Sequence, residues 1–82
     1  MGHNWVLLAQ GTDINKFGAA ASKFADNDYL PKDSDQVLAA TKLIGGGQET
    51  TIEFTAPEAG TYDFICSFPG HYAMMKGKFI VE

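Results

Sequence analysis

One stretch of the chain restricts the fold more than any other: "TYDFICSF", which starts at residue 61 and carries an apolar side chain at every second position. Tyr62, Phe64 and Cys66 share one face of this stretch, and Asp63 and Ser67 lie on the other. A period of two is typical of a β-strand with one packed face and one face open to water. The chain is therefore expected to form a sheet, and other segments must pair with this strand.

We expect strands in three further segments, residues 3–9, 50–56 and 76–82. The first is almost wholly apolar, and the second alternates apolar with polar side chains. Residues 36–44 fit a helix or a strand, and three glycines follow them. Short strands separated by turn signals are typical of an antiparallel β-sandwich.

One short helical insertion is expected around residues 13–25. Apolar side chains recur there at steps of three and four residues: Ile14, Phe17, Ala21 and Phe24. Thr12 or Asp13 can cap the start of this helix. Gly18 should weaken it by about 1 kcal/mol relative to Ala.

The whole chain, residues 1–82, is predicted to be a single mainly β domain. It supplies four or five strands, whereas a closed two-sheet sandwich usually has about seven. We therefore expect an incomplete sandwich: either the chain pairs with something else, or its first strands are missing.

Composition excludes two classes of partner. Six basic and ten acidic side chains give a net charge of -4, which argues against nucleic acid, because phosphate binding needs clustered Lys and Arg. No apolar run approaches the roughly 20 residues that span a bilayer. Residues 1–4 also lack the basic and apolar regions of a signal peptide. We therefore expect a soluble chain without a membrane span.

Sulfur and imidazole side chains gather in one short stretch near the end of the chain. Cys66 is the only cysteine, His71 follows it after a Phe-Pro-Gly turn, and Met74 and Met75 come next. The only other histidine is His3. A cysteine thiolate, two imidazoles and a distant thioether form the ligand set of a blue-copper electron-transfer centre. The sequence therefore predicts that both histidines, the cysteine and one of the two methionines bind copper.

Two other interpretations of these residues stay open. Cys66 could act as a nucleophile with His71 as its base, in a cysteine-histidine enzyme. Alternatively, a free amino terminus followed by His3 could bind Cu(II) or Ni(II) in a square plane, through the amine, two backbone amides and the imidazole, without a redox function.

The glycines at 45–47 are not expected to form a phosphate loop, because no Lys-Ser/Thr pair follows them.

Four stretches of the chain resemble the cupredoxins, and most closely the azurins and azurin-like proteins: "MGHNWVL", "TKLIGGGQ", "GTYDFIC" and "CSFPGHYAMMKGKFIV". Cys66, His71 and Met75 match the family spacing of Cys, four residues, His, three residues, Met. The resemblance runs over essentially the whole chain. It implies a cupredoxin-like Greek-key β-sandwich and a type 1 copper protein that carries electrons and is not an enzyme. Azurins have further strands and a disulfide before their "MGHNW", so the resemblance also implies that this chain is truncated at its N-terminus.

The resemblance implies a role for each residue that would surround the copper ion. His3, Cys66 and His71 would be the three strong ligands. Met75, rather than its neighbour, would be the weak axial ligand, and the carbonyl of Gly2 would lie on the opposite axial side.

Further roles follow from the same resemblance. Asn4 would tether the two ligand loops by hydrogen bonds, and the amide of Phe68 would donate a hydrogen bond to the Cys66 sulfur and tune the potential. Redox partners such as small c-type cytochromes or copper reductases would dock, in the periplasm, on an apolar patch around His71 formed by Met1, Phe68, Pro69, Gly70, Ala73 and Met74.

Overall fold

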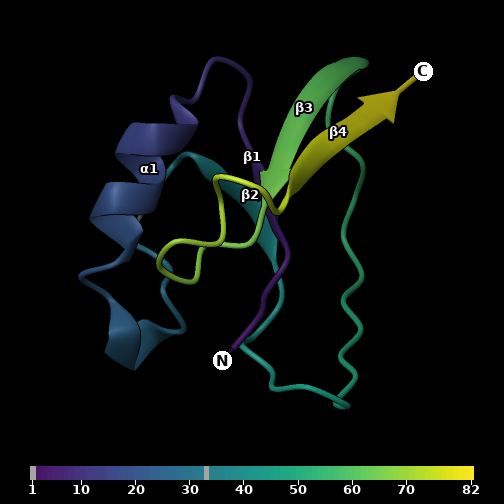
Figure 1. Cartoon of the computed structure of the whole chain (residues 1–82). Helices are drawn as coiled ribbons and strands as arrows, with labels where there is room; N and C mark the ends of the chain where they lie inside the picture. The colour runs from purple at the N-terminus through teal and green to yellow at the C-terminus, as the bar shows by residue number, and fades with distance from the viewer. Residues whose placement is uncertain (1, 33) are drawn as a thin grey trace.

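The computed structural model describes residues 2–32 and 34–82, and it is built around one antiparallel sheet. Its elements in chain order are β1 (Val6–Leu8), α1 (Ile14–Ala21), the 3-10 helix η1 (Ala25–Asn27), β2 (Val37–Ala40), β3 (Gly60–Ile65) and β4 (Lys76–Val81). The strands are ordered β2-β1-β3-β4, and each neighbouring pair is antiparallel. Helix α1 lies on one side of the sheet, and the long irregular segment between β2 and β3 lies on the other (Figure 1). The predicted mainly β fold with one short helix is therefore confirmed.

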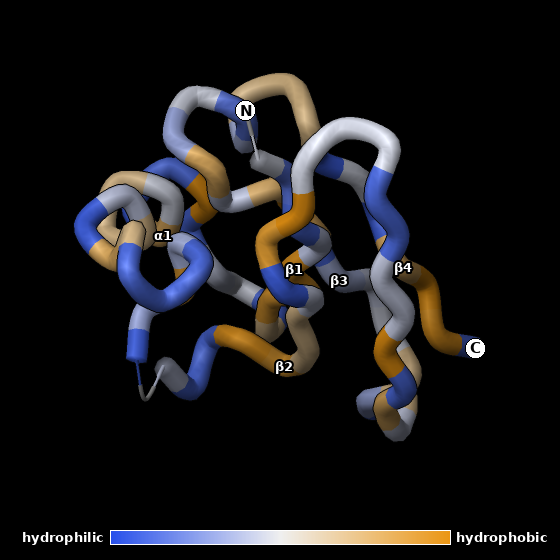
Figure 2. Tube along the Cα trace, turned by 90° about the horizontal axis from the view of Figure 1, so that it is seen from below, coloured by the Kyte–Doolittle hydropathy of each residue, from blue (hydrophilic) through white to orange (hydrophobic). Residues whose placement is uncertain are grey.

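The central strand β1 forms the core together with β3 and α1. Val6 and Leu8 are fully buried, and Val6 lies opposite Ile65 of β3. Phe17 and Ala21 of α1 pack on these three side chains. The two strands β1 and β2 are among the most hydrophobic parts of the chain (Figure 2). This core fixes β1, and with it the residues that precede β1 in the sequence.

The opposite face of the sheet carries a cluster of aromatic rings. Trp5 lies with its ring centroid 5.8 Å from Phe54, 5.5 Å from Phe64 and 6.0 Å from Phe79. The hydroxyl of Tyr62 donates a hydrogen bond of 2.5 Å to the carbonyl of Glu58, which holds the irregular segment against the start of β3.

Two sequence expectations about strands are settled by pairing. Residues 36–44, which fitted a helix or a strand, form strand β2 at Val37–Ala40, because this segment pairs with β1. The prediction of a strand at residues 50–56 is wrong, since this segment is irregular. Its Phe54 ring packs on the aromatic face, but no strand among the described residues pairs with its backbone. The alternating pattern thus predicted the contact of the Phe54 ring, which is still 38% exposed, but it wrongly predicted a paired strand.

Helix α1 is shorter than predicted but begins where a cap was expected. The side chain of Asp13 accepts a hydrogen bond of 3.1 Å from the backbone N–H of Lys16, which is the N-cap arrangement. The α-helix ends at Ala21, residues 22–24 lie outside any helix, and η1 begins only at Ala25, the last residue of the predicted range. No helix in the described part of the chain has the length and apolar character needed to cross a membrane.

Gly18 has a packing role that helix propensity alone does not predict. A Cβ atom placed on Gly18 would lie only 2.3 to 2.6 Å from three ring carbons of Tyr72. Tyr72 belongs to the loop between β3 and β4 and packs against the core. The missing side chain therefore lets this loop dock closely on α1.

We expect the Gly18→Ala variant to be less stable than the natural chain. Helix propensity favours Ala by about 1 kcal/mol, but an overpacked contact usually costs about 1–3 kcal/mol. Because the clash with the Tyr72 ring should outweigh the gain in helix propensity, the free energy of unfolding should fall. Urea denaturation followed by circular dichroism measures this change.

The control is the same substitution in a Tyr72→Ala background. Without the ring, Gly18→Ala should raise the free energy of unfolding, since only helix propensity remains. A stabilising Gly18→Ala substitution in the protein that keeps Tyr72 would contradict the packing account.

Candidate metal centre

His3 is held in place by the backbone just before β1. Its N–H donates to the carbonyl of Ile44 at 2.8 Å, and the N–H of Ile44 donates back to the carbonyl of His3 at 2.8 Å. This isolated antiparallel bridge fixes the Cα position of His3. The side chain therefore starts from a rigid part of the fold.

Cys66 and His71 are positioned by a tight loop between β3 and β4. Cys66 directly follows β3, and its N–H donates to the carbonyl of Met75 at 2.9 Å. The N–H of His71 donates to the carbonyl of Phe68 at 3.0 Å, and the turn between them uses Gly70 at φ +83°, a left-handed conformation that favours glycine. The N–H of Met75 donates to the carbonyl of His71 at 2.7 Å and closes the loop. These backbone hydrogen bonds fold the loop back, so that His71 lies close to the sulfur of Cys66.

The structure brings His3, Cys66 and His71 together from the two ends of the chain. One ligand atom of each residue lies within 4.8 Å of the ligand atoms of the others. Cys66 Sγ lies 3.7 Å from Nδ1 of His71. The two imidazole rings are stacked, with centroids 5.0 Å apart and an interplanar angle of 28°. Cys66 is buried, and the two histidines are half-buried.

These donor atoms fit a metal ion. Nδ1 of His3 is buried and has no hydrogen-bond partner among the described residues. A buried polar atom without a partner costs free energy, and a bound cation would satisfy it. Metal–nitrogen and metal–sulfur bonds of about 2.0–2.3 Å place two ligand atoms of one ion roughly 3.5–4.3 Å apart. The 3.7 Å separation of Cys66 Sγ and His71 Nδ1 lies in that range.

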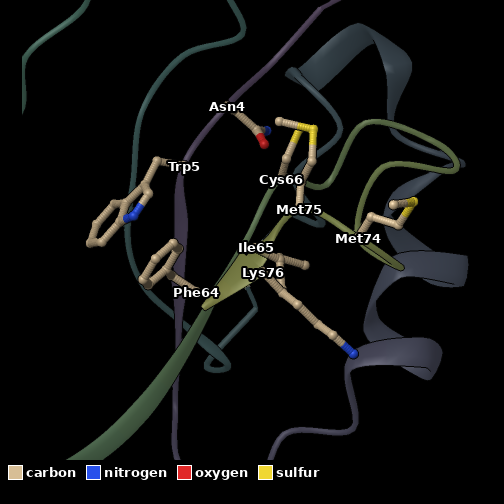
Figure 3. A pocket seen from close by; sticks show the side chains of 8 residues that line it. All are labelled: Asn4, Trp5, Phe64, Ile65, Cys66, Met74, Met75 and Lys76. Carbon is tan, nitrogen blue, oxygen red and sulfur yellow. The ribbon is translucent and has the colours of Figure 1, made fainter. Parts of the chain in front are cut away.

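The two methionines differ in their relation to the cysteine. Met75 lies opposite Cys66 because their backbones are hydrogen-bonded. Both methionines line the same cavity of about 290 Å³ as Cys66. Figure 3 shows Met75 and Cys66 pointing the same way, toward Asn4, whereas Met74 points away from them. Met74 is 89% exposed and Met75 is 42% exposed.

The remaining residue predicted near the axial position is Gly2. It is half-buried beside His3. A Cβ atom at Gly2 would lie 2.8 Å from the side chain of Leu43, so the backbone passes close to that residue.

Asn4 joins the segment that carries His3 to the segment that carries Cys66. Its Oδ1 accepts a hydrogen bond of 2.8 Å from the backbone N–H of Ser67, and its Nδ2 donates to Oγ of Ser67 at 2.8 Å. Nδ2 also donates to the carbonyl of Asp28 at 3.0 Å. Within the described residues, the amide of Phe68 makes no hydrogen bond to the sulfur of Cys66.

The residues predicted for the docking patch lie at the surface near His71. Pro69, Gly70 and Ala73 are exposed, as is Met74. The ring of Phe68 is half-buried, with its centroid 4.7 Å from that of His71. Met1 lies outside the described residues.

Sequence reasoning missed two residues next to the centre. Ser67 was assigned only to the polar face of its strand, yet it is fully buried. Its position directly after the only cysteine was the available signal. Tyr29 contacts the ligand loop from a distant segment, and nothing in the local sequence indicated this contact.

Comparison with known proteins gives one consistent result. The family described as copper binding proteins, plastocyanin/azurin family, matches residues 1–82. The chain is 41% identical to auracyanin-A of Chloroflexus aurantiacus, covering 98% of this chain and 51% of that protein. It is 45% identical to azurin of Bordetella pertussis, covering 94% of this chain and 53% of that protein.

Solved structures agree with the sequence matches. Reduced auracyanin from Roseiflexus castenholzii superposes with a TM-score of 0.90 at 43% identity, covering all of this chain and 67% of that one. Auracyanin A of Chloroflexus aurantiacus, described as a "blue" copper protein, gives a TM-score of 0.92 at 38% identity, covering all of this chain and 68% of that one. The chain spans about half to two thirds of the length of the curated relatives that it matches.

Sequence, fold and site geometry therefore all indicate a copper-binding protein. The His3, Cys66 and His71 cluster could hold one copper ion, and its donor atoms are those of the soft, mixed sulfur and nitrogen sites that bind copper. The chain belongs to the plastocyanin/azurin family of copper-binding proteins.

Proposed function

We propose that this protein is a type 1 copper protein that carries single electrons between redox partners. The observation that carries the proposal is the convergence of one thiol and two imidazoles, with Nδ1 of His3 buried and unpartnered among the described residues. Copper, when bound, supplies a reversible one-electron change between Cu(I) and Cu(II). The chain supplies a ligand set that suits both states, because thiolate favours Cu(I) and imidazole accepts either.

The backbone around these ligands supports a centre that changes little when an electron moves. His3 is fixed by its bridge to Ile44, and Cys66 is fixed by its hydrogen bond to Met75. Ligands held in this way are pre-organised, which is the property that a carrier of electrons needs. We propose Met75 as the weak axial ligand and the carbonyl of Gly2 as the group on the opposite side.

The exposed residues around His71 are the proposed route to the partner. Exposed small or apolar groups lie on the loop that carries His71, at Pro69, Gly70, Ala73 and Met74. Such a surface can dock a partner briefly, without a large desolvated contact. Small c-type cytochromes or copper reductases in the periplasm are the partners and the location that the family resemblance suggests.

From the same resemblance, we propose that the amide of Phe68 donates a hydrogen bond to the thiolate of Cys66 in the copper-loaded protein.

A cysteine nucleophile with His71 as its base is less well supported. The 3.7 Å contact between Cys66 Sγ and His71 Nδ1 would suit it. His3, however, is gathered around the same sulfur and has no role in such a mechanism. Cys66 is also only 3% exposed. The copper interpretation gives all three side chains a role.

Adding Cu(II) to the metal-free protein should produce an intense blue absorption band, because the thiolate of Cys66 donates charge to the metal. Cys66→Ser should abolish this band, since the transition transfers charge from the thiolate sulfur to Cu(II) and a serine oxygen gives no such transition. His71→Gln is the matched variant, because it removes one proposed ligand and leaves the amino-terminal Met-Gly-His sequence intact. Absorption spectra recorded during the titration measure the blue band in the natural protein and in both variants.

The same titration separates the blue centre from a square-planar site at the amino terminus. The amino-terminal site would give only a weak violet band, and this band would persist in both Cys66→Ser and His71→Gln. If the Cys66→Ser variant gives the same Cu(II) spectrum as the natural protein, the proposed electron-transfer function is refuted.

The two methionines can be separated by their effect on the reduction potential. We expect Met75→Leu to raise the potential, because an aliphatic side chain in the axial position makes the site more hydrophobic and lowers the coordination number, and both changes favour the less charged Cu(I) centre. A tenfold change in the ratio of the two affinities corresponds to about 59 mV for a one-electron couple, and a shift on this order is expected. Cyclic voltammetry of the copper-loaded variants measures it.

Met74→Leu is the matched control and should leave the potential near that of the natural protein. The opposite pattern, with a large shift for Met74→Leu alone, would assign the axial position to Met74.

A further inference from the structure

A left-handed turn far from the ligands in the sequence contacts the metal loop. Asp28 and Tyr29, directly after η1, have φ angles of 55° and 57°. We propose that this turn is a positioning element for the copper ligands, which sets where Cys66 and His71 lie before the metal binds. This inference rests on the proposed function and adds residues that touch no ligand atom.

The conformation of the turn is unusual and is maintained by its own hydrogen bonds. Two consecutive non-glycine residues in the left-handed region are disfavoured, because the Cβ atom approaches the following carbonyl. The N–H of Tyr29 donates to the carbonyl of Phe24 at 2.9 Å. Asn27 Nδ2 donates to the carbonyl of Leu30 at 2.7 Å and closes the turn from the other side. Disfavoured backbone that is held in place by its surroundings often marks a functional region.

The turn presents two carbonyl groups to the segments that carry the ligands. The carbonyl of Asp28 accepts a hydrogen bond of 3.0 Å from Asn4, the neighbour of His3. The carbonyl of Tyr29 accepts a hydrogen bond of 2.6 Å from Oγ of Ser67, the neighbour of Cys66. Ser67 is fully buried, so this contact is shielded from water. The left-handed turn thus bonds to a residue beside each of two proposed ligands.

The side chain of Tyr29 continues the contact to the third ligand through a row of rings. The rings of Tyr29 and Phe68 meet edge to face, with centroids 5.1 Å apart and an interplanar angle of 68°. Phe68 then lies 4.7 Å from His71, and His71 lies 5.0 Å from His3. Edge-to-face packing is directional. Tyr29 therefore restricts the place of Phe68, and Phe68 restricts the ring of His71.

The test removes the ring of Tyr29 and keeps the turn. Asparagine adopts the left-handed region more readily than most residues, so Tyr29→Asn should preserve the backbone and the carbonyl that accepts from Ser67. Tyr29→Phe is the matched control, because the Tyr29 hydroxyl makes no hydrogen bond within the described part of the chain.

Two measurements compare these variants with the natural protein. In the metal-free protein, the rate at which a maleimide labels Cys66 reports how firmly the loop is held. We expect a several-fold faster rate for Tyr29→Asn and an unchanged rate for Tyr29→Phe. In the Cu(II)-loaded protein, the thiolate absorption band should shift or weaken for Tyr29→Asn and remain unchanged for Tyr29→Phe.

Several outcomes would overturn the proposal. One is a Tyr29→Asn variant that matches the natural protein in both measurements. A second is a labelling rate that rises only in proportion to the globally unfolded fraction, as determined by a urea series, because that reflects stability alone. A third is a Tyr29→Phe variant as altered as Tyr29→Asn, which would assign the effect to the hydroxyl.

The measurements also distinguish this proposal from the proposed function. If the natural protein gives no thiolate band with Cu(II), the electron-transfer proposal fails. The labelling rates in the metal-free protein still decide whether Tyr29 positions the loop.

Discussion

The reciprocal hydrogen bonds between Asn4 and Ser67 are the interaction on which the rest of the site depends. They join residues separated by 63 positions in the sequence, one beside His3 and the other beside Cys66. Each such bond contributes about 0.5–1.5 kcal/mol net, and losing one partner costs more when the other is buried. Ser67 is fully buried, so its amide depends on the bond to Asn4, while its hydroxyl accepts from Asn4 and donates to the carbonyl of Tyr29. The short β1–β3 pairing also brings the two ligand segments together, but it does not bind the residues beside the ligands directly.

Hydrogen bonds and packing within the fold position the candidate ligands. Short backbone hydrogen bonds fix His3 to Ile44 and the Cys66–Met75 pair across the base of the loop. The docking of Tyr72 on Gly18 ties the same loop to α1. A centre built in this way suits the proposed one-electron carrier, because the ligands can keep their positions in both oxidation states.

The sequence could predict what depends on local spacing, and it failed where tertiary contacts decide. The strand at β3 followed from alternation, and the candidate ligands followed from the interval between Cys66 and His71 and from the presence of only one other histidine. The backbone partner of residues 50–56 could not be predicted, since alternation does not say which strand lies alongside. Gly18 looked like a weakness of the helix, because its contact with Tyr72 comes from a residue 54 positions later in the sequence. The left-handed turn at Tyr29 contains no glycine, so the usual signal for such a turn was missing.

X-ray absorption spectroscopy of the copper-loaded protein tests the central claim most directly, because it identifies the atoms bound to the metal. The account predicts one sulfur and two imidazole nitrogens bound directly to a single copper ion, as His3, Cys66 and His71 would supply. A spectrum that shows only nitrogen and oxygen ligands would contradict it, since the thiolate of Cys66 would then lie outside the copper site.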